Sequence, residues 1–532
     1  MVADDSLIAL HCRAPRAPWA SVTCTVALLT GCVGPRYVVP EVDTPSHYKE
    51  VAPAAYESAT PGTWQPAQPQ DAALKGKWWE LFGAPELDEL EEQLNINNQT
   101  LAQAFQNFMA ARAQVSEARA NYFPTVTTNP SATRTHSART SSGAFTVNPG
   151  TGTGGGATTA GNTVATASGA TFNEFSLPFE VSWEPDLWGR IRDTVRESRY
   201  AAQVSAADLE NQRLTEQAAL AEFYFQLRGQ DSLQSLYNQT IEADRKSLEL
   251  TRVLLETGID NPEDVAQAEV ILANAEATGA GIATQRAMYE HAIATLIGKP
   301  ASTFALPVKE LSTPVPSLPL GLPSQLLQRR PDVAAAERTM AQANAAIGVA
   351  TTAYYPTLDL TASGGFDSTT ISKLLTAPAR FWSLGASAAE TIFDAGLRKA
   401  TVAQYTAQFN ADVAAYRQVV LTAFQQVEDS SAALRITSQQ IERERVAVAA
   451  AQRFLDVAIA RYQTGIDPYL NVTAAQTNLL MAQQAEVTLR VNEMTAAVQL
   501  IQALGGGWDV GKLPTAAAVT SREAAQQLSQ KP

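Results

Sequence analysis

The sequence predicts a fold that combines long α-helices with a membrane β-barrel, built from two tandem repeats in one chain. Three observations lead to this fold class: a repeat at an offset of 207 residues, helical stretches of about 70 residues, and strands that alternate between apolar and polar residues. After Cys32 no run of about 18 apolar residues occurs, as a membrane helix would require. A closed β-barrel is the other structure that satisfies all backbone groups within lipid.

The composition argues against several classes of function. The chain has 532 residues and a net charge of −14, and it lacks the basic stripe that binds nucleic acid. Its four histidines are scattered, without an HExxH motif or a Cys/His cluster, so we expect no protein-bound metal and no cofactor. No Ser/His/Asp or Cys/His spacing indicates a catalytic site, which disfavours an envelope hydrolase.

The first 32 residues contain all three cysteines and resemble a secretory signal. Arg13 and Arg16 precede an apolar stretch, which ends in the sequence Leu-Thr-Gly-Cys at residues 29–32. This ending resembles the lipobox of bacterial lipoproteins and implies that Cys32 is lipidated and becomes the mature N-terminus. Val33 stands where an aspartate would retain a lipoprotein at the inner membrane, so export to the outer membrane is allowed. The alternative is an unmodified thiol in an uncleaved signal.

An internal repeat organises the rest of the chain. The sequence Thr-Gly-Ile-Asp at residues 257–260 recurs at 464–467, and residues 186–298 match 393–505 without a gap. The first copy also contains an additional Thr/Gly-rich stretch at 140–169, whose composition is typical of a flexible loop. No Gly-Lys-Ser/Thr follows this stretch, which excludes a phosphate-binding loop.

Each copy begins with a helical segment that ends at a proline, Pro124 or Pro356, and strands follow. Apolar and polar residues alternate at 175–183, 358–363 and 382–389, whereas the strand after Pro124 alternates poorly. Period-two alternation predicts one apolar and one polar face. In a membrane barrel these faces meet lipid and a water-filled lumen; for a single strand, a half-buried soluble sheet is the alternative. Two strands per copy give four per chain, so a spanning barrel would require oligomerisation.

Long helices follow the strands. Residues 397–464 contain no glycine or proline, and residues 191–257 contain one glycine, so each predicts a helix of about 105 Å. Return helices of about 37 residues end near Gly298 and Gly505. Such lengths are typical of coiled coils or helical tubes.

Several motifs together resemble the outer-membrane factor family of the TolC and OprM type, including its NodT branch. They lie at residues 37–40, 78–82, 87–90, 294–298, 322–332 and 461–465, and the last two read Leu-Pro-Ser-Gln-Leu-Leu-Gln-Arg-Arg-Pro-Asp and Arg-Tyr-Gln-Thr-Gly. The resemblance implies a homotrimer with a twelve-stranded barrel, an α-helical periplasmic tunnel and a mixed collar. It also implies a periplasmic adaptor and an inner-membrane pump as partners, in addition to outer-membrane lipid.

We therefore predict six segments along the chain. They are a signal peptide at 1–31, a lipid-anchored segment and collar at 32–85, a first repeat at 86–298, a collar linker at 299–323, a second repeat at 324–505, and a C-terminal collar or tail at 506–532.

The two turns between the long helices and the return helices are the predicted adaptor-docking tips, because adaptors of the family bind helix tips. The docking residues are Thr257, Gly258 and Ile259 in the first tip, and Thr464, Gly465 and Ile466 in the second. A glycine at a helix C-terminus is often a left-handed cap, and both roles can hold at once.

A periplasmic gate is predicted beside the tips. Asp260 and Asp467 would place up to six carboxylates around the mouth of a trimer, and Arg461 and Tyr462 would hold neighbouring helices closed. The alternative is that the two aspartates begin the return helices and cap free N–H groups. Leu255 stands in the first tip at the place of Tyr462, so a tyrosine contact belongs to the second hairpin only.

The function predicted from these features is a passive conduit for small molecules, from the periplasm to the exterior, in a tripartite efflux or type I export system. A structural coiled-coil envelope lipoprotein without transport activity is the alternative. Paired strands in register with two helical repeats favour the conduit, because a structural spacer has no need of them.

Overall fold

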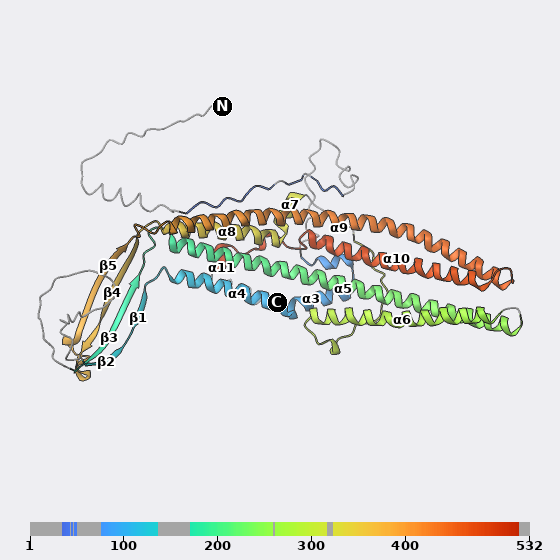
Figure 1. The fold of residues 1–532 in the computed structure, drawn as a ribbon, viewed down its shortest axis with the longest axis horizontal. Coiled ribbons are helices and arrows are strands. Elements are labelled where there is room, and N and C mark those ends of the chain that lie inside the picture. Colours follow the sequence, from blue (N-terminus) through green and yellow to red (C-terminus); the bar gives the residue numbers. More distant parts are fainter. Residues whose placement is uncertain are drawn as a thin grey trace, which may run out of the picture. The chain divides into compact units, whose positions relative to one another are not determined.

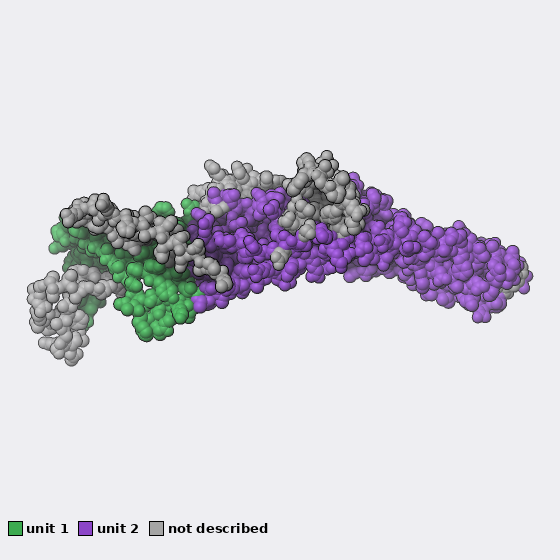
Figure 2. All heavy atoms as spheres, turned by 90° about the horizontal axis from the view of Figure 1, so that it is seen from above, with its two compact units in different colours: residues 1–34, 117–194, 348–402 green, residues 35–116, 195–347, 403–532 purple. Residues whose placement is uncertain are grey.

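The computed structural model describes residues 34–42, 44–45, 47–50, 76–136, 171–258, 261–316 and 323–520 (Figure 1). The chain divides into two compact units, coloured green and purple in Figure 2. The first contains the β-strands, and the second contains most of the helical residues. The predicted lipidation site, Cys32, and the Thr/Gly-rich stretch at 140–169 lie outside the described residues.

The first unit contains an antiparallel sheet of five strands, in the order β1-β3-β4-β5, with β2 also paired to β3. The strands are β1 (Thr125–Thr128), β2 (Ser131–His136), β3 (Thr171–Trp183), β4 (Thr357–Ser368) and β5 (Arg380–Ala389). The prediction of two strands per copy is therefore wrong for the first copy, which has three.

The additional strand arises from an interruption. Thr125 pairs with Ser182 of β3 and Ser131 pairs with Ser176, so β2 continues the register of β1 without a shift. Pro130 lies between the two strands and lacks the N–H that a ladder bond would need. Across the sheet, β1 and β2 therefore occupy the position of one strand.

The register of the sheet separates an apolar face from a polar face. Phe179 is opposite Gly364, which is opposite Trp382, and Val181 is opposite Ala362, which is opposite Leu384; we call this side the apolar face. Glu180, Ser363 and Ser383 lie across the sheet on the other side, the polar face. Trp382 and Leu384 are 78% and 76% exposed in the single chain. The predicted alternation is confirmed, and these apolar side chains are not buried within the single chain.

The second unit contains two helical hairpins, each with a long helix and a shorter return helix (Figure 1). The first pairs α5 (Arg190–Glu256) with α6 (Pro262–Leu296), and the second pairs α9 (Leu397–Gln463) with α10 (Tyr469–Ala503). Both long helices have 67 residues and both return helices have 35. The predicted long and return helices are confirmed, and every helix bound of the first hairpin recurs 207 residues later in the second.

Shorter helices complete the two units. They are α3 (Pro85–Asn97), α4 (Gln99–Ala120), α7 (Pro323–Arg329), α8 (Pro331–Thr352) and α11 (Ala516–Thr520), with a 3-10 turn, η2, at Trp78–Phe82. The aromatic residues of η2 are buried in the main core of the second unit, where Phe82 lies 5.0 Å from the ring of Phe225 on α5. Within the described residues, no helix is long and apolar enough to cross a membrane.

Candidate functional site: the tips of the two helical hairpins

The tip of the second hairpin is a glycine-capped helix end. Gly465 has a φ of 72°, and its N–H donates to the carbonyl of Tyr462 at 2.9 Å. The N–H of Ile466 donates to the carbonyl of Arg461 at 2.9 Å. These two bonds form a Schellman motif, which satisfies carbonyls that the end of α9 would leave unpaired. The alternative interpretation of this glycine as a cap is therefore confirmed.

The first tip ends in the same backbone conformation. Gly258 has a φ of 75°, and its N–H donates to the carbonyl of Leu255 at 3.0 Å. The next helix, α6, begins with Asn261 as its N-cap, whose side chain accepts from the N–H of Asp264 at 3.0 Å. The alternative in which Asp260 caps this helix is thus wrong, because Asn261 fills that position. Ile259 and Asp260 themselves lie outside the described residues.

The described tip residues are open to solvent. Thr257, Gly258, Thr464 and Gly465 are exposed, and Ile466 is 64% exposed. An added Cβ would contact nothing within 4 Å at either glycine. Both tips therefore present free surface in the single chain, and their role in docking stays a prediction.

Two predicted gate residues form an ion pair with each other. The Nε of Arg461 lies 2.5 Å from Oδ2 of Asp467, and its Nη2 lies 3.0 Å from Oδ1. The hydrogen bond from Arg461 lowers the pKa of the Asp467 carboxyl below its ordinary value, and a hydrogen bond with Asn471 acts in the same direction. The alternative in which Asp467 caps α10 is wrong, since Pro468 is the N-cap and no side chain caps it.

Tyr462 lies in the apolar contact between the two hairpins of one chain. It is 7% exposed, and its ring lies 5.2 Å from that of Tyr469 on α10. The same cluster includes Leu248 of α5 and Ala268 of α6. Its ring therefore packs inside the protomer.

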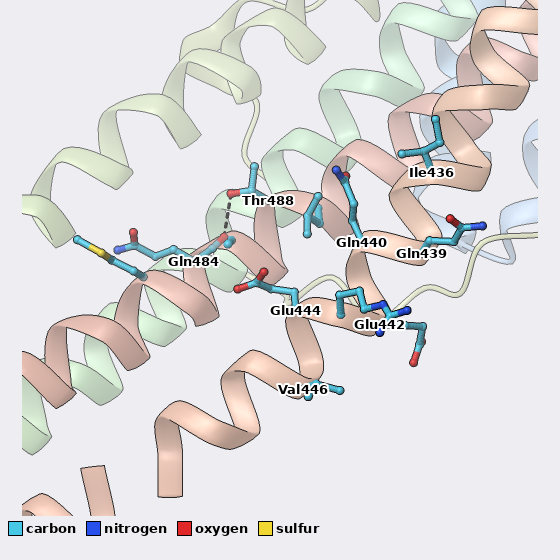
Figure 3. A pocket seen from close by; sticks show the side chains of 12 residues that line it. Ile436, Gln439, Gln440, Glu442, Glu444, Val446, Gln484 and Thr488 are labelled. Atoms are coloured by element: carbon cyan, nitrogen blue, oxygen red, sulfur yellow. Dashed lines mark hydrogen bonds between the residues drawn. The ribbon is translucent and has the colours of Figure 1, made fainter. Parts of the chain in front are cut away.

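A groove between α9 and α10 was not predicted from the sequence (Figure 3). Its lining mixes apolar and polar side chains, among them Ile436, Gln440, Val446 and Met481. Residues about 45 positions apart meet there through the antiparallel hairpin, so a local pattern carries no signal of it. No group of three or more potential metal ligands occurs among the residues that the structure describes.

A buried carboxyl on α5 was also not predicted from the sequence. Asp244 of α5 is 3% exposed, its Oδ2 has no hydrogen-bond partner, and burial raises its pKa to about 6. One turn further along α5, Ser247 accepts a hydrogen bond of 3.1 Å from Gln476 of α10. The contact between α5 and α10 is thus partly polar, and a buried titratable group lies nearby in the sequence of α5.

Comparisons with known proteins agree with this architecture. The model of the outer membrane efflux protein family matches residues 90–299 and 322–506. The chain is 30% identical over 492 residues to the probable efflux pump outer membrane protein TtgC of Pseudomonas putida, covering 92% of this chain and 95% of that protein. It is 30% identical over 461 residues to the pyoverdine export outer membrane protein OpmQ of Pseudomonas aeruginosa, covering 86% and 93%. A solved structure of the outer-membrane channel OprN has a TM-score of 0.76 and 27% identity, covering 90% of this chain and all of that one.

Proposed function

The chain belongs to the outer membrane efflux protein family and serves as an outer-membrane efflux channel, and we propose that three copies form each channel. Each copy would contribute four strand positions, so that three close a twelve-stranded barrel with the apolar face toward lipid. The helices of the three copies would form a periplasmic tunnel. The segments 32–85, 299–323 and 506–532 would form the collar around it.

The exposed apolar face of the sheet carries this proposal. An apolar surface that includes Trp382 and Leu384 is unfavourable in water, and burying it against lipid or protein is favourable by about 25 cal/mol per Å². The opposite face is rich in serine and threonine, which suits a water-filled lumen. A sheet with one face of each kind fits a barrel wall better than it fits a soluble spacer.

Assembly with other parts of an efflux system extends the proposal. The hairpin tips, with Thr257, Gly258, Ile259, Thr464, Gly465 and Ile466 as the docking residues, would bind a periplasmic adaptor that connects to an inner-membrane pump. Lipidation of Cys32 would anchor the mature N-terminus in the outer membrane. Because a single acyl chain binds a membrane only weakly, the barrel rather than the lipid would hold the protein in place.

Neighbouring positions on β5 provide the experiment. Leu384→Arg places a charge on the apolar face, where such a change costs about 2–4 kcal/mol near the middle of a bilayer. Ser383→Arg places the same charge on the polar face, where water can solvate it. We expect the first variant to lose assembly in outer membranes and the second to assemble.

Native mass spectrometry of the detergent-extracted protein reports the copy number, and planar-bilayer recording reports conductance. Three copies that conduct ions support the proposed channel. A monomeric product without conductance, or equal tolerance of arginine at both positions, would contradict it and leave a structural envelope lipoprotein as the better description.

A further inference from the structure

The apolar face of the sheet ends in basic residues. This face is apolar at every position over 175–183 of β3 and 382–388 of β5. Beyond these stretches, the register places Arg134, His136 and Arg380 on the same face. All the acidic residues of the described strands lie on the polar face instead. The apolar face therefore combines a continuous apolar surface with charges of one sign at its margin.

These basic residues lie toward the end of the sheet away from the helices. Because α4 precedes β1 and α5 follows β3, the helices join the end that contains Thr125 and Trp183. Arg380 and Ala388 are the two ends of the apolar face of β5, roughly 27 Å apart along the strand, or roughly 20 Å in height at a tilt of about 40°. Since the apolar band of a membrane barrel is about 25 Å tall, Arg380 lies at its margin. In the proposed channel this margin is the headgroup region of the outer leaflet.

The two edges of the sheet, β1–β2 and β5, have no partner strand within the described residues, and the internal repeat predicts how they join. Thr125 pairs with Ser182, and their counterparts 232 and 207 residues later also pair with each other. Between the repeats, Phe175 of β3 pairs with Ser368 of β4. The same two offsets therefore predict the register in which β5 of one copy meets β2 of the next.

The counterparts of that β3–β4 pair at the joint are Trp382 of one copy and His136 of the partner subunit. Arg380 and the partner subunit's Arg134 lie on either side of this pair, each two residues away along its strand, or roughly 7 Å. In the single chain the Nδ1 of His136 lies 2.7 Å from the Oγ1 of Thr171 on the neighbouring strand. The joint thus gathers three basic side chains around one tryptophan.

We propose that each joint between two copies binds the phosphate groups of an outer-leaflet glycolipid, through Arg380 of one copy and the partner subunit's Arg134 and His136. The inference rests on the proposed trimeric channel, which would hold three such sites. The fork of N–H donors on arginine suits phosphate, and its long side chain can extend from the apolar band to the headgroups. Tryptophan is enriched at the same boundary, where Trp382 would pack against the upper acyl chains.

Binding of lipid A to the purified protein in detergent, measured by fluorescence titration, tests the inference. R134Q/R380Q should bind lipid A about 25-fold more weakly than the wild type, from about fivefold for each arginine. Arg380→Gln alone should give the about fivefold change, and it covers the case in which the double variant does not assemble. The matched control is R245Q/R252Q, which removes the same charge from exposed ion pairs on α5 and should leave binding unchanged.

Dephosphorylated lipid A and inorganic phosphate identify the chemistry that the site recognises. The wild type should bind both more weakly than lipid A. Equal binding of lipid A and its dephosphorylated form would overturn the inference, because acyl contacts alone would then suffice. Inorganic phosphate that binds as tightly as lipid A would overturn the assignment to a lipid. Unchanged lipid A binding by both R134Q/R380Q and Arg380→Gln would overturn the assignment to these residues.

A disulfide on the polar face tests the joint itself. In the predicted register Ser383 lies opposite the partner subunit's Thr135, so Ser383→Cys with Thr135→Cys should crosslink copies under oxidation. Ser383→Cys with Thr133→Cys is two residues out of register and should not. Crosslinking by the second pair alone would separate the basic residues and overturn the site. A protein that stays monomeric would instead overturn the proposed function on which the inference rests.

Discussion

The two helical hairpins have the same helix lengths and turns but differ in where their charged side chains lie. Arg228 of the first hairpin is 2% exposed, whereas Arg435, which stands 207 residues later, has a side chain that is 42% exposed. Asp244 of the first hairpin is buried, and Ala451 stands at its place in the second. The two copies of the repeat therefore agree in helix lengths and turns. They differ in the polar contacts that stabilise each hairpin.

The hydrogen bonds of Arg228 and Arg435 show which segments each arginine connects to its long helix. Arg228 donates to Glu86 at 2.7 Å, to Asp231 at 2.9 Å and to the carbonyl of Pro307 at 2.7 Å. Those bonds connect α5 to α3 and to the segment between the repeats. Arg435 donates to Glu50 at 2.5 Å and thereby contacts the N-terminal segment. Both arginines hold a peripheral segment against a long helix, but only the first does so away from water.

The largest expected effect is the loss of the buried arginine. Arg228→Met keeps much of the side-chain volume but removes one of the two cations that contact Asp231, which is 1% exposed. Arg286 remains 2.6 Å from Asp231, so the cost should lie at the lower end of the about 3–5 kcal/mol that breaking a buried ion pair costs. Arg435→Met removes an exposed ion pair and should cost about 0–1 kcal/mol. Thermal unfolding of the detergent-solubilised protein at one scan rate compares the two. Equal losses of stability would show that the burial of Arg228 does not make its contacts more stabilising than the exposed ion pair of Arg435.

Asp244 gives the next largest effect, and the size of this effect depends on pH. Its pKa in the folded protein is about 6, above the ordinary aspartate value of 3.8, so the folded state binds the proton more tightly than the unfolded state. Its contribution to stability is therefore most favourable at acidic pH and is lost as pH rises from about 4 to 6. We expect Asp244→Asn to stabilise the protein at pH 7.5, by no more than about 3 kcal/mol, and to have little effect near pH 4.

The measurement for this change is chemical unfolding of wild type and Asp244→Asn across that pH range. Ala451→Asn, at the equivalent place in the second hairpin, is the control, and its effect should not vary with pH. A difference between wild type and Asp244→Asn that is constant from pH 4 to 7.5 would contradict titration at this site.

Much of this architecture, but not its internal chemistry, could be predicted from the sequence. The bounds of α5 and α9 follow from the scarcity of glycine and proline over some 70 residues, which is a local property of the chain. The break between β1 and β2 lies at Pro130, which is likewise a local property of the chain. By contrast, the burial of Arg228 and Asp244 depends on segments far apart in sequence, and so does the packing of Tyr462. Helical periodicity does not identify such partners.

A smaller effect on stability is expected at the tip glycines, with a larger consequence for transport. Gly258→Leu and Gly465→Leu each force a branched side chain into the left-handed conformation, at a cost of about 1–2 kcal/mol. Because the surrounding space is open, the protein should remain folded. If the tips dock the adaptor, the double variant should abolish efflux in cells while outer-membrane levels stay normal. Full drug resistance in cells that express the double variant would argue against docking at the tips.

The smallest energetic change concerns the proposed gate, where the hairpins differ again. Arg461 pairs with Asp467 across the second tip, whereas the first tip has Leu254 at the place of Arg461. An exposed ion pair contributes little by itself, so Arg461→Ser should open the channel only partly. Tyr462→Phe keeps the ring in its apolar cluster and removes only the hydroxyl, so it should also act partly. The two changes together should raise single-channel conductance more than either alone.

The first hairpin supplies the control for that experiment. Arg252 forms an exposed ion pair of 2.7 Å with Glu269, which joins α5 to α6 much as Arg461 joins the ends of α9 and α10. If closure belongs to the second hairpin, Arg252→Ser should leave conductance unchanged. Equal conductance of the Arg461→Ser/Tyr462→Phe variant and wild type, with the trimer intact, would show that these residues do not close the channel. Equal opening by Arg252→Ser would instead show that any loosened hairpin opens it, because the gate would then depend on helix pairing in general rather than on the Arg461–Asp467 contact.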